Sequence, residues 1–418
     1  MGEYVSLKIG AYDYLSCKNS FGDLLLFFTE DDLIIDVEML DGEEYKTYCF
    51  STTVEKAKKC LDCLGHTLSR ARADFECDKA DKIEFAQYEN ETSYEIELRK
   101  HFTFENWLTA ARKFAWLLSN DKYDEEAYNY PLIEKERIQN QTISERIVLE
   151  SLPFGEDFFG LNYSNIDVWS IFRAILDVFD SETQIKLDYS NLFYGGWCNE
   201  IPEPEDYSVP QTIILTEGKY DAEVISNSIK ILYPYMAKFY SFINFSDYKV
   251  QGSTNFLTHY FKVFIASGIQ NRVIALYDND SAGLSELVDL EKMVLPNNFR
   301  VMHLPDLELA NDYPTLGPSG KENMNINGKA CSIELFLGQD VLSDNGEFTP
   351  IQWKGFIEKV QTYQGEIMRK GYVQEKFRKK VAETLHNDVI DESQWIEMKK
   401  LLTAIFCIFE DYEDKISC

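Results

Sequence analysis

Two aspartates close a run of apolar residues in the second half of the chain, in the stretch RVIALYDNDSAG. Asp278 and Asp280 are two positions apart, so in extended chain their side chains point the same way and can share one target. A third acid, Glu217, follows a similar apolar run, TIILT. Carboxylates that converge repel one another unless a cation lies between them, and ligation by oxygen alone suits Mg²⁺ or Mn²⁺. These residues predict a metal site that acts on a phosphodiester; the alternative is that the aspartates only cap the following helix.

The elements around these acids follow a regular order. From residue 211 onward, apolar runs of strand length alternate with stretches of helical period, and the connections are short. This order is typical of a mostly parallel sheet with helices on both faces, in which ligands bind beyond the carboxyl ends of the strands. Two of the four expected strands end there in acids, and Gly283 allows a tight turn into the next helix. The expected strands are TIILTEG, FYSFINF, RVIALY and FRVMHL.

The same stretches resemble the Toprim domain, which topoisomerases, bacterial primases and several groups of nucleases share. TEGKYDAEVI is similar to the family's glutamate motif and LYDNDSAG to its aspartate motif, and the resemblance covers roughly residues 211–338. It implies an α/β fold and a Mg²⁺-dependent enzyme that cuts or joins phosphodiesters. Glu217, Asp278 and Asp280 would be its catalytic residues and metal ligands.

Three further residues receive a role from this resemblance. Asp221, one helical turn after Glu217, matches an acid that helps the nuclease members to hold a second metal; the alternative is an ordinary acid in the first turn of a helix. In NGKACSIELFLG, Lys329 and Glu334 match a lysine and an acid that nuclease members carry after the last strand. Glu334 would then ligate metal, and Lys329 would steady the charge of the transition state.

The remainder of the chain resembles the prokaryotic HEPN/Toprim-associated proteins, which are found among phage-defence genes. The opening MGEYVSLKIGAYDYLSCKNSFGDLL and the stretch YPTLGPSG carry this resemblance. HEPN ribonucleases place a histidine a few residues after an arginine. Here Arg99 and His101 are too close together, and Arg378 and His386 are too far apart. A second, HEPN-type ribonuclease site is therefore not expected.

Three regions are expected along the chain. Residues 1–200 form an α+β domain that begins with the short strands YVSLKI, LLLFF, DLIIDVEM and YKTYCF, and Thr103 caps a later helix. The segment NEIPEPEDYSVP, with three prolines and four acids, marks the end of this domain. Residues 211–340 form the Toprim domain. Residues 350–418 form a helical C-terminal segment, with helices around FIEKVQTYQGEIMRK and QWIEMKKLLTAIFCIFEDY. Trp395 and Leu401 belong to an apolar stripe that is either core or a homo-oligomer surface.

The formal net charge of −30 conflicts with a chain that grips nucleic acid alone, because phosphate binding normally needs a basic surface. Two hypotheses follow. The first is a nuclease of a prokaryotic anti-phage defence system that cuts DNA or structured RNA such as tRNA, with its activity latent until a trigger or a nearby-encoded ATPase or sensor partner engages it. The second is a non-catalytic acidic scaffold or regulatory subunit that binds a basic or ATPase partner. The intact acids favour the first hypothesis, and the charge favours the second.

Cysteine usage and hydropathy suggest a cytoplasmic protein. The nine cysteines are odd in number and scattered, and the sequence shows no secretory signal and no apolar stretch that could span a membrane. Cys60, Cys63, His66 and Cys77 could hold zinc. However, a helical apolar stripe runs through the same stretch, so buried thiols on a core helix are the preferred interpretation.

Overall fold

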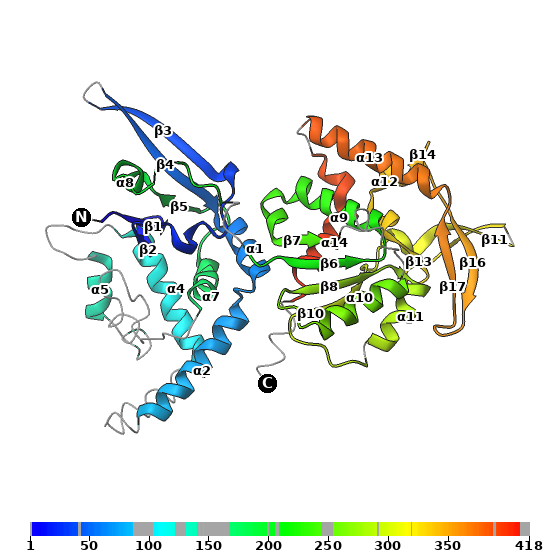
Figure 1. Ribbon diagram of the computed structural model, residues 1–418, viewed down its shortest axis with the longest axis horizontal. Coiled ribbons are helices and arrows are strands. Elements are labelled where there is room, and N and C mark those ends of the chain that lie inside the picture. The colour runs from blue at the N-terminus through cyan, green and yellow to red at the C-terminus, as the bar shows by residue number, and fades with distance from the viewer. Residues whose placement is uncertain are drawn as a thin grey trace. The chain divides into compact units, whose positions relative to one another are not determined.

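The computed structural model describes residues 2–40, 43–86, 103–121, 131–139, 142, 145, 167–198, 200–204, 209–243, 254–290, 292–318, 320–387 and 390–409. The chain forms two compact units, one from Met1 to Val209 and the other from Pro210 to Phe409 (Figure 1). The boundary between them lies at the end of the proline-rich segment NEIPEPEDYSVP.

The first unit contains a five-stranded antiparallel sheet with the order β2-β1-β5-β4-β3. β5 occupies the middle of this sheet, between β1 and β4, although the main helices of the unit precede it in the chain. β3 lies at one edge. The strands are β1 (Tyr4–Ile9), β2 (Tyr12–Lys18), β3 (Leu33–Leu40), β4 (Glu43–Thr53) and β5 (Gln184–Asp188).

Helices complete the first unit and bury an aromatic core. Thr103 caps α4 as expected, because its hydroxyl oxygen accepts the Asn106 N–H at 3.2 Å. Phe27 packs against Trp169 and Phe172 of α7. The helices are α1 (Val54–Leu64), α2 (Leu68–Ala86), α4 (Phe104–Asn120), α5 (Pro131–Gln139), α7 (Val168–Ile175) and α8 (Ser190–Tyr194), with the 3₁₀ turns η1 (Gly22–Leu25), η2 (Glu30–Asp32) and η3 (Leu176–Val178).

One expected strand of the first unit is wrong. The run LLLFF forms the end of η1 and a turn, although Leu25, Phe27 and Phe28 are fully buried. A short run that is apolar at every position has neither a helical nor a strand period, so only its burial was predictable. The strands β2 and β5 were not expected, although polar and apolar residues alternate in both, as is typical of half-buried strands.

The second unit is built on a four-stranded parallel sheet with the order β10-β8-β6-β7. The expected alternation of strands and helices is confirmed: each of the first three strands leads into a helix before the next strand begins. These elements are β6 (Thr212–Thr216), α9 (Lys219–Leu232), η5 (Pro234–Phe239), β7 (Tyr240–Phe242), α10 (Thr254–Ala266), β8 (Val273–Tyr277), α11 (Ser281–Leu290) and β10 (Phe299–His303).

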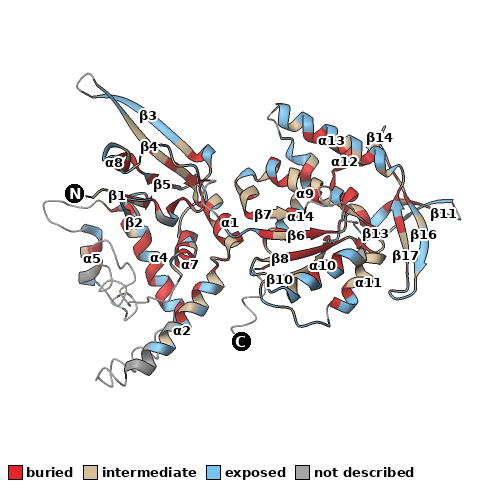
Figure 2. Ribbon diagram, in the orientation of Figure 1, coloured by how far each residue is buried: buried red, intermediate tan, exposed pale blue. Residues whose placement is uncertain are grey.

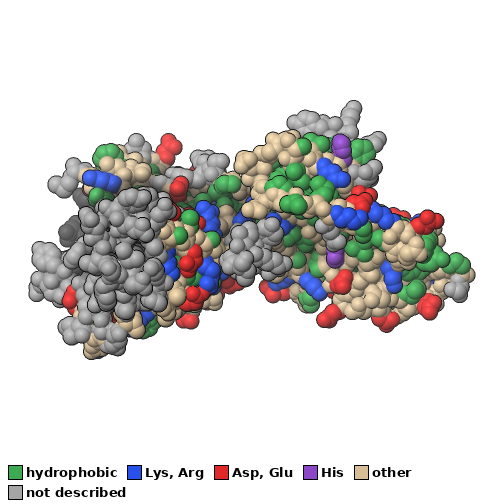
Figure 3. Space-filling view, turned by 90° about the horizontal axis from the view of Figure 1, so that it is seen from below, with side chains coloured by type: hydrophobic (Ala, Val, Ile, Leu, Met, Phe, Trp, Pro, Cys, Tyr) green, Lys and Arg blue, Asp and Glu red, His purple; other side chains and the backbone are tan. Residues whose placement is uncertain are grey.

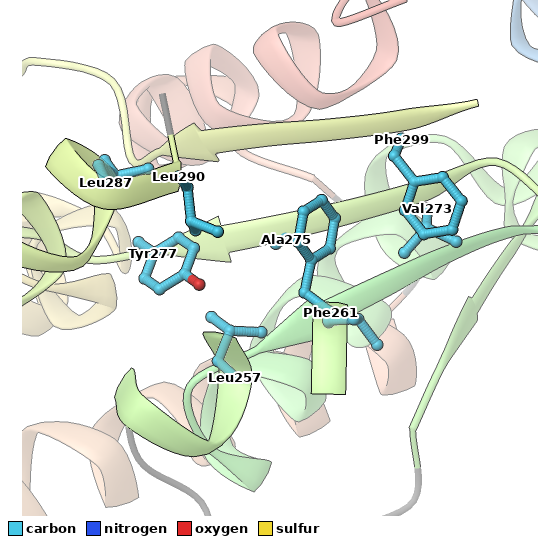
Figure 4. Close-up of a cluster of buried hydrophobic side chains, with 9 residues drawn as sticks. Leu257, Phe261, Val273, Ala275, Tyr277, Leu287, Leu290 and Phe299 are labelled. Carbon is cyan, nitrogen blue, oxygen red and sulfur yellow. The ribbon is translucent and has the colours of Figure 1, made fainter. Parts of the chain in front are cut away.

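Apolar side chains from α10 and α11 cover one face of this sheet (Figure 4). Phe261 of α10 and Leu290 of α11 pack against alternate residues of β8, namely Val273, Ala275 and Tyr277. All five residues of β8 are buried, as Figure 2 shows for the central strands, so β8 is a fully buried parallel strand. A rigid strand of this kind fixes the position of the residue that follows it.

The remaining part of the second unit contains a second, mixed sheet with the order β12-β11-β16-β17. It is joined to the parallel sheet through a short antiparallel pair, β9 with β13. These elements are β9 (Asn279–Asp280), η6 (Leu309–Asp312), β11 (Tyr313–Gly317), β12 (Gly320–Met324), β13 (Ala330–Cys331), η7 (Ile333–Phe336), α12 (Gln339–Leu342), β14 (Ser343–Asp344), β15 (Glu347–Phe348), β16 (Ile351–Ile357), β17 (Thr362–Ile367), α13 (Lys370–Asn387), η8 (Glu392–Trp395) and α14 (Ile396–Phe406).

The expected helical segment 350–418 is partly wrong. Its first part is the β16–β17 hairpin, and helices begin only at α13. The spacing of Ile357, Val360 and Tyr363 fits a helix, but Gly355 and Gly365 lower helix propensity, and Ile351 pairs with Thr315 of the distant β11. Trp395 and Leu401 are buried, so the apolar stripe of α14 belongs to the core of this unit.

Charges of both signs are mixed on the surface. On the face drawn in Figure 3, Lys and Arg side chains lie beside Asp and Glu side chains in each unit. An exposed ion pair joins Lys359 and Asp289 at an N–O distance of 2.9 Å, and a largely buried one joins Arg173 and Asp62 at 2.7 Å. Ion pairs therefore neutralise some of the 71 acids, while the net excess of 30 negative charges remains.

Candidate functional site

The ends of two neighbouring parallel strands place the first two acids side by side. Glu217 follows β6 and Asp278 follows β8, and the two strands pair directly. The Asp278 backbone N–H donates to Glu217 Oε1 at 3.0 Å. The chain passes from β6 to β7 on one side and returns to β8 on the other, so this pair lies at the point where the strand order reverses. Ligands of open α/β sheets bind at such switch points.

The short β9–β13 pair brings a third acid to the same place. Because Cys331 pairs with Asn279, the chain after β13 runs back toward the end of β8. The Ile333 N–H then donates to Asp278 Oδ1 at 3.2 Å. The next residue, Glu334, is fully buried.

Three side chains hold the buried carboxylate of Glu334. Ser332 Oγ donates to Glu334 Oε2 at 2.6 Å, and Gln374 Nε2 donates to Oε1 at 2.9 Å. The Lys370 ammonium, in the first turn of α13, lies 3.2 Å from the same oxygen. Burial alone would lower the pKa of Lys370, but the charges of Glu334, Asp278 and Asp221 raise it above its ordinary value, so Lys370 stays protonated.

Asp221 lies in the first turn of α9, as its position after Glu217 suggested. Its Oδ2 accepts the Gly218 N–H at 2.9 Å, which is the bond of a helix-capping acid. Burial, followed by the charges of Glu334 and Glu217, raises the pKa of Asp221 to about 7. The residue is therefore both a first-turn helix acid and a neighbour of the other carboxylates, so the two interpretations of Asp221 are compatible.

Asp278 interacts with all the other acids. Burial raises its pKa well above the ordinary value, and the negative charges of Glu217, Asp221, Asp280 and Glu334 raise it further. We call these five residues the carboxylate cluster. Repulsion of this kind costs folding free energy, which is typical of sites that a function maintains.

Asp280 differs from the other members of the cluster because it caps α11. Its Oδ1 accepts the N–H groups of Ala282 and Gly283 at 3.0 and 2.8 Å, and its Oδ2 accepts from Gln364 Nε2. Asp280 therefore does cap the following helix, and only 7% of the residue is exposed. Gly283 permits the tight turn, since a Cβ atom there would lie 2.2 Å from the Asp278 carbonyl oxygen.

Lys329 does not point into the carboxylate cluster. The backbone of Lys329 forms an isolated parallel bridge with Asp280, but its ammonium donates to the Asn325 carbonyl oxygen at 3.1 Å rather than to a cluster acid. The lysine that contacts a cluster acid through its ammonium is Lys370, 3.2 Å from Glu334 Oε1. Sequence reasoning missed Lys370, Gln364 and Gln374, because no motif marks them and the fold alone brings them to the acids.

The cluster is not arranged as a finished metal site. Among the described residues, no three His, Cys, Asp or Glu side chains are positioned to hold one ion as they stand. Glu217 and Asp278 are tied to backbone N–H groups and Asp280 to its helix. A cation would therefore require rotation of at least some of these side chains.

Comparison with known proteins assigns the first half of the chain to a family. The family model described as HEPN/Toprim N-terminal domain 1 matches residues 1–210. The chain belongs to this family. No curated protein and no solved structure matches it. The expected HEPN/Toprim association is thereby confirmed, while the carboxylate cluster of this HEPN/Toprim family member lies in the second unit, beyond the matched residues.

Three other expectations concern regions outside the carboxylate cluster. Cys60 and Cys63 are buried on α1, as the core-helix interpretation requires, whereas Cys77 is exposed on α2 and His66 contacts Asp167. Within the described ranges, no helix combines the length and the apolarity needed to cross a bilayer. Arg378, on α13, pairs with Glu223 at 3.1 Å, and Arg99 and His101 lie outside the described residues.

Proposed function

We propose that the second unit is a Toprim-type nuclease domain and that the carboxylate cluster binds Mg²⁺ or Mn²⁺ to cleave phosphodiester bonds in DNA or structured RNA. The single observation that supports this most strongly is the convergence on Asp278. Glu217 and Asp278 leave adjacent parallel strands at a switch point, and Asp221 and Glu334 reach the same place from other elements. Acids without a shared role have no reason to gather where they repel one another.

The donor set fits a hard divalent cation. All five side chains offer carboxylate oxygen, no histidine or thiol is required, and a cation would relieve the repulsion that raises the pKa of Asp278. Glu217, Asp221, Asp278 and Glu334 are the residues that would hold it, with Asp280 limited by its bonds to α11. When bound, such an ion supplies an activated water and stabilises the leaving oxygen.

The chain's own residues would contribute positioning and charge. The N–H groups of Asp278 and Ile333 orient the carboxylates of Glu217 and Asp278. Lys370, which stays protonated, places a positive charge beside the acids and would donate to a phosphate oxygen as a second acceptor besides Glu334. In this proposal Lys370 replaces Lys329 as the lysine that steadies transition-state charge.

A non-catalytic role is the second candidate, and the bonds of Asp280 favour it. An acid whose two oxygens cap a helix and accept from Gln364 has a sufficient structural reason to be present. In that case the second unit would be a scaffold for a basic partner protein, and the negative net charge of the chain would attract that partner. A partner or trigger is also part of the nuclease proposal, as is a role in anti-phage defence and a place in the cytoplasm.

The experiment that separates these candidates is a cleavage assay with the full chain. Labelled plasmid, linear duplex, single-stranded DNA and tRNA are incubated with Mg²⁺, Mn²⁺ or a chelator. Metal-dependent products that disappear in Glu217→Ala and Asp278→Ala support the nuclease. Asp289→Ala is the matched control, because Asp289 is an exposed acid that pairs with Lys292 and Lys359 rather than with the cluster.

Two outcomes would count against the nuclease. Cleavage that persists in both cluster variants means that the activity comes from another site. If no substrate is cut and Mn²⁺ titration by calorimetry shows no binding that the cluster variants abolish, the scaffold is the better description. Calorimetry tests metal binding even when a trigger for cleavage is missing.

A further inference from the structure

The edge strand β3 of the first unit leaves a row of backbone groups without a partner. β4 pairs with β5 only over Cys49–Thr53, and beyond this β3 and β4 continue as a two-stranded hairpin (Figure 1). β3 ends the strand order of its sheet, so its outer side faces no described strand. An edge of this kind can accept an additional strand from another chain.

Hydrogen bonds on the far side of β4 fix which residues of β3 face outward. The Lys46 N–H donates to Tyr194 Oη and Tyr194 Oη donates to the Lys46 carbonyl oxygen, both at 2.9 Å. The Tyr189 N–H donates to the Tyr48 carbonyl oxygen at 3.0 Å, and the Tyr48 N–H donates to Ser190 Oγ at 2.9 Å. The backbone groups of Lys46 and Tyr48 therefore point away from β3.

The backbone N–H and C=O groups of the β3 residues that pair with Lys46 and Tyr48 must then point away from β4. These partners are Val37 and Ile35, and Met39 follows in the same alternation. In an antiparallel ladder the two residues of a pair either both bond across or both point outward. Among the described residues, the N–H and C=O groups of Ile35, Val37 and Met39 have no backbone partner. The open edge thus offers three residues with both groups directed outward.

The side chains on the two faces of β3 differ in chemistry. Ile35, Val37 and Met39 share one face and are 42, 55 and 68% exposed. Asp36 and Glu38 are exposed on the opposite face. A strand added at this edge would gain apolar contacts on one face and meet two carboxylates on the other.

These carboxylates disfavour a second copy of the chain as the occupant. In antiparallel pairing of two β3 strands, outward-directed residues must pair with one another. A pair centred on Asp36 places Asp36 opposite itself, one centred on Val37 places Asp36 opposite Glu38 twice, and one centred on Glu38 places Glu38 opposite itself. A pair centred on Ile35 avoids like charges, but it leaves Met39 beyond the end of the other strand. Like charges directly opposite each other are destabilising. The same carboxylates would stabilise a strand that carries Lys or Arg at the facing positions.

We propose that the β3 edge is a docking site for an extended segment of a partner protein in which basic residues alternate with apolar residues. The segment adds to the sheet as a sixth, antiparallel strand beside β3. Its backbone bonds to Ile35, Val37 and Met39 supply affinity, and its Lys or Arg residues opposite Asp36 and Glu38 supply selectivity. This site lies in the first unit and does not depend on the nuclease proposal.

The test uses two displayed libraries of segments of about eight residues, the length of an ordinary strand. Both carry Val, Ile or Leu at alternate positions; one carries Lys or Arg between them and the other Glu or Asp. The full chain should enrich the basic library, and the tightest segment is then synthesised for fluorescence anisotropy. Val37→Pro should weaken its binding by about tenfold or more, because proline removes an outward N–H without touching the bonds between β3 and β4. Val37→Thr, which keeps that N–H, is the matched control.

A charge-reversal variant and a hydrogen-exchange measurement test whether the segment binds at the β3 edge itself. The double variant Asp36→Lys with Glu38→Lys should shift enrichment from the basic library to the acidic one. On binding, the amides of Ile35, Val37 and Met39 should gain protection in the wild-type chain. Thermal unfolding shows whether each variant keeps its fold. If Val37→Pro does not fold, hydrogen exchange on the wild-type chain still tests the proposal.

Three results would overturn the proposal. The first is equal enrichment of the two libraries. The second is binding that Val37→Pro leaves unchanged in a folded chain and that gives no protection at β3. The third is dimerisation in sedimentation experiments that Val37→Pro abolishes, because a second copy would then be the occupant of the edge.

Discussion

The two sheets of this protein expose opposite parts of their strands. In the parallel sheet β10-β8-β6-β7, the central strand β8 is buried along its whole length, and the acids that follow β6 and β8, Glu217 and Asp278, are partly exposed. In the antiparallel sheet β2-β1-β5-β4-β3, the accessible part is the long side of β3. The first sheet presents side-chain carboxylates at a point, and the second presents backbone amides along a line. The first arrangement suits chemistry on one bond, and the second suits recognition of an extended chain.

The largest expected effect tests the strand ends. Asp278→Asn keeps the shape of the side chain but removes its charge, so metal-dependent cleavage should fall by about a hundredfold or more. The same change should raise the free energy of unfolding by roughly 1 kcal/mol, because it removes repulsion from the other cluster acids. Initial cleavage rates and urea unfolding measure the two effects. Loss of activity together with loss of stability would instead make Asp278 a structural residue.

The next effect concerns the turn that holds the strand end in place. Gly283→Ala should destabilise the second unit by about 2 kcal/mol or more, because the new Cβ would lie 2.2 Å from the Asp278 carbonyl oxygen and force the backbone apart. Chemical unfolding measures this. Gly371→Ala is the control, since no heavy atom lies within 4 Å of its new Cβ. Equal stabilities of the two variants would show that the approach of α11 to Asp278 is not tight.

The carboxylate cluster at the end of the parallel sheet should make the stability of the protein depend on pH. Because the pKa of Asp221 is raised to about 7 from an ordinary value near 3.8, the folded chain binds more protons than the unfolded chain between these values. Stability should therefore fall as the pH rises from 5 to 8, by up to a few kcal/mol. Thermal unfolding across this range measures the fall, and Asp221→Asn should flatten it. A stability that rises with pH in the wild type but not in the variant would contradict the raised pKa.

The smallest expected effect tests the β3 edge in the free protein. The amides of Ile35, Val37 and Met39 should exchange with solvent about ten times faster than those of Ile34, Asp36 and Glu38, which bond to β4. Residue-resolved hydrogen exchange measures this alternation. Uniform rates along β3 would mean that the hairpin opens as a whole or that its outer side is already covered.

The difference between the two sheets also explains what could be predicted. β6 and β8 are local apolar runs, and the rule for parallel sheets brings their ends together, so Glu217 and Asp278 were predictable as neighbours. Capping of α11 by Asp280 was predicted only as an alternative, because aspartate is common both as a metal ligand and as a helix cap. The cluster lysine was misplaced to Lys329, since Lys370 reaches Glu334 only after β16 and β17 have formed a hairpin.

The β3 edge could not be predicted at all. Its sequence indicates a strand, but an edge is defined by the absence of a neighbour, and neighbours in this sheet come from distant parts of the chain. β5 is the clearest case, because Leu187 pairs with both Leu7 and Phe50. Local periodicity contains no information about such pairings.

The central position of β5 has a consequence for biosynthesis. During translation, β1 and β4 emerge early, but the strand that joins them is made only after all the described helices of the first unit except α8. Until Asp188 has left the ribosome, each of these two strands carries an unpaired side, and nascent chains of this length are vulnerable to association and proteolysis. The sheet of the first unit therefore cannot be completed before β5 has been synthesised.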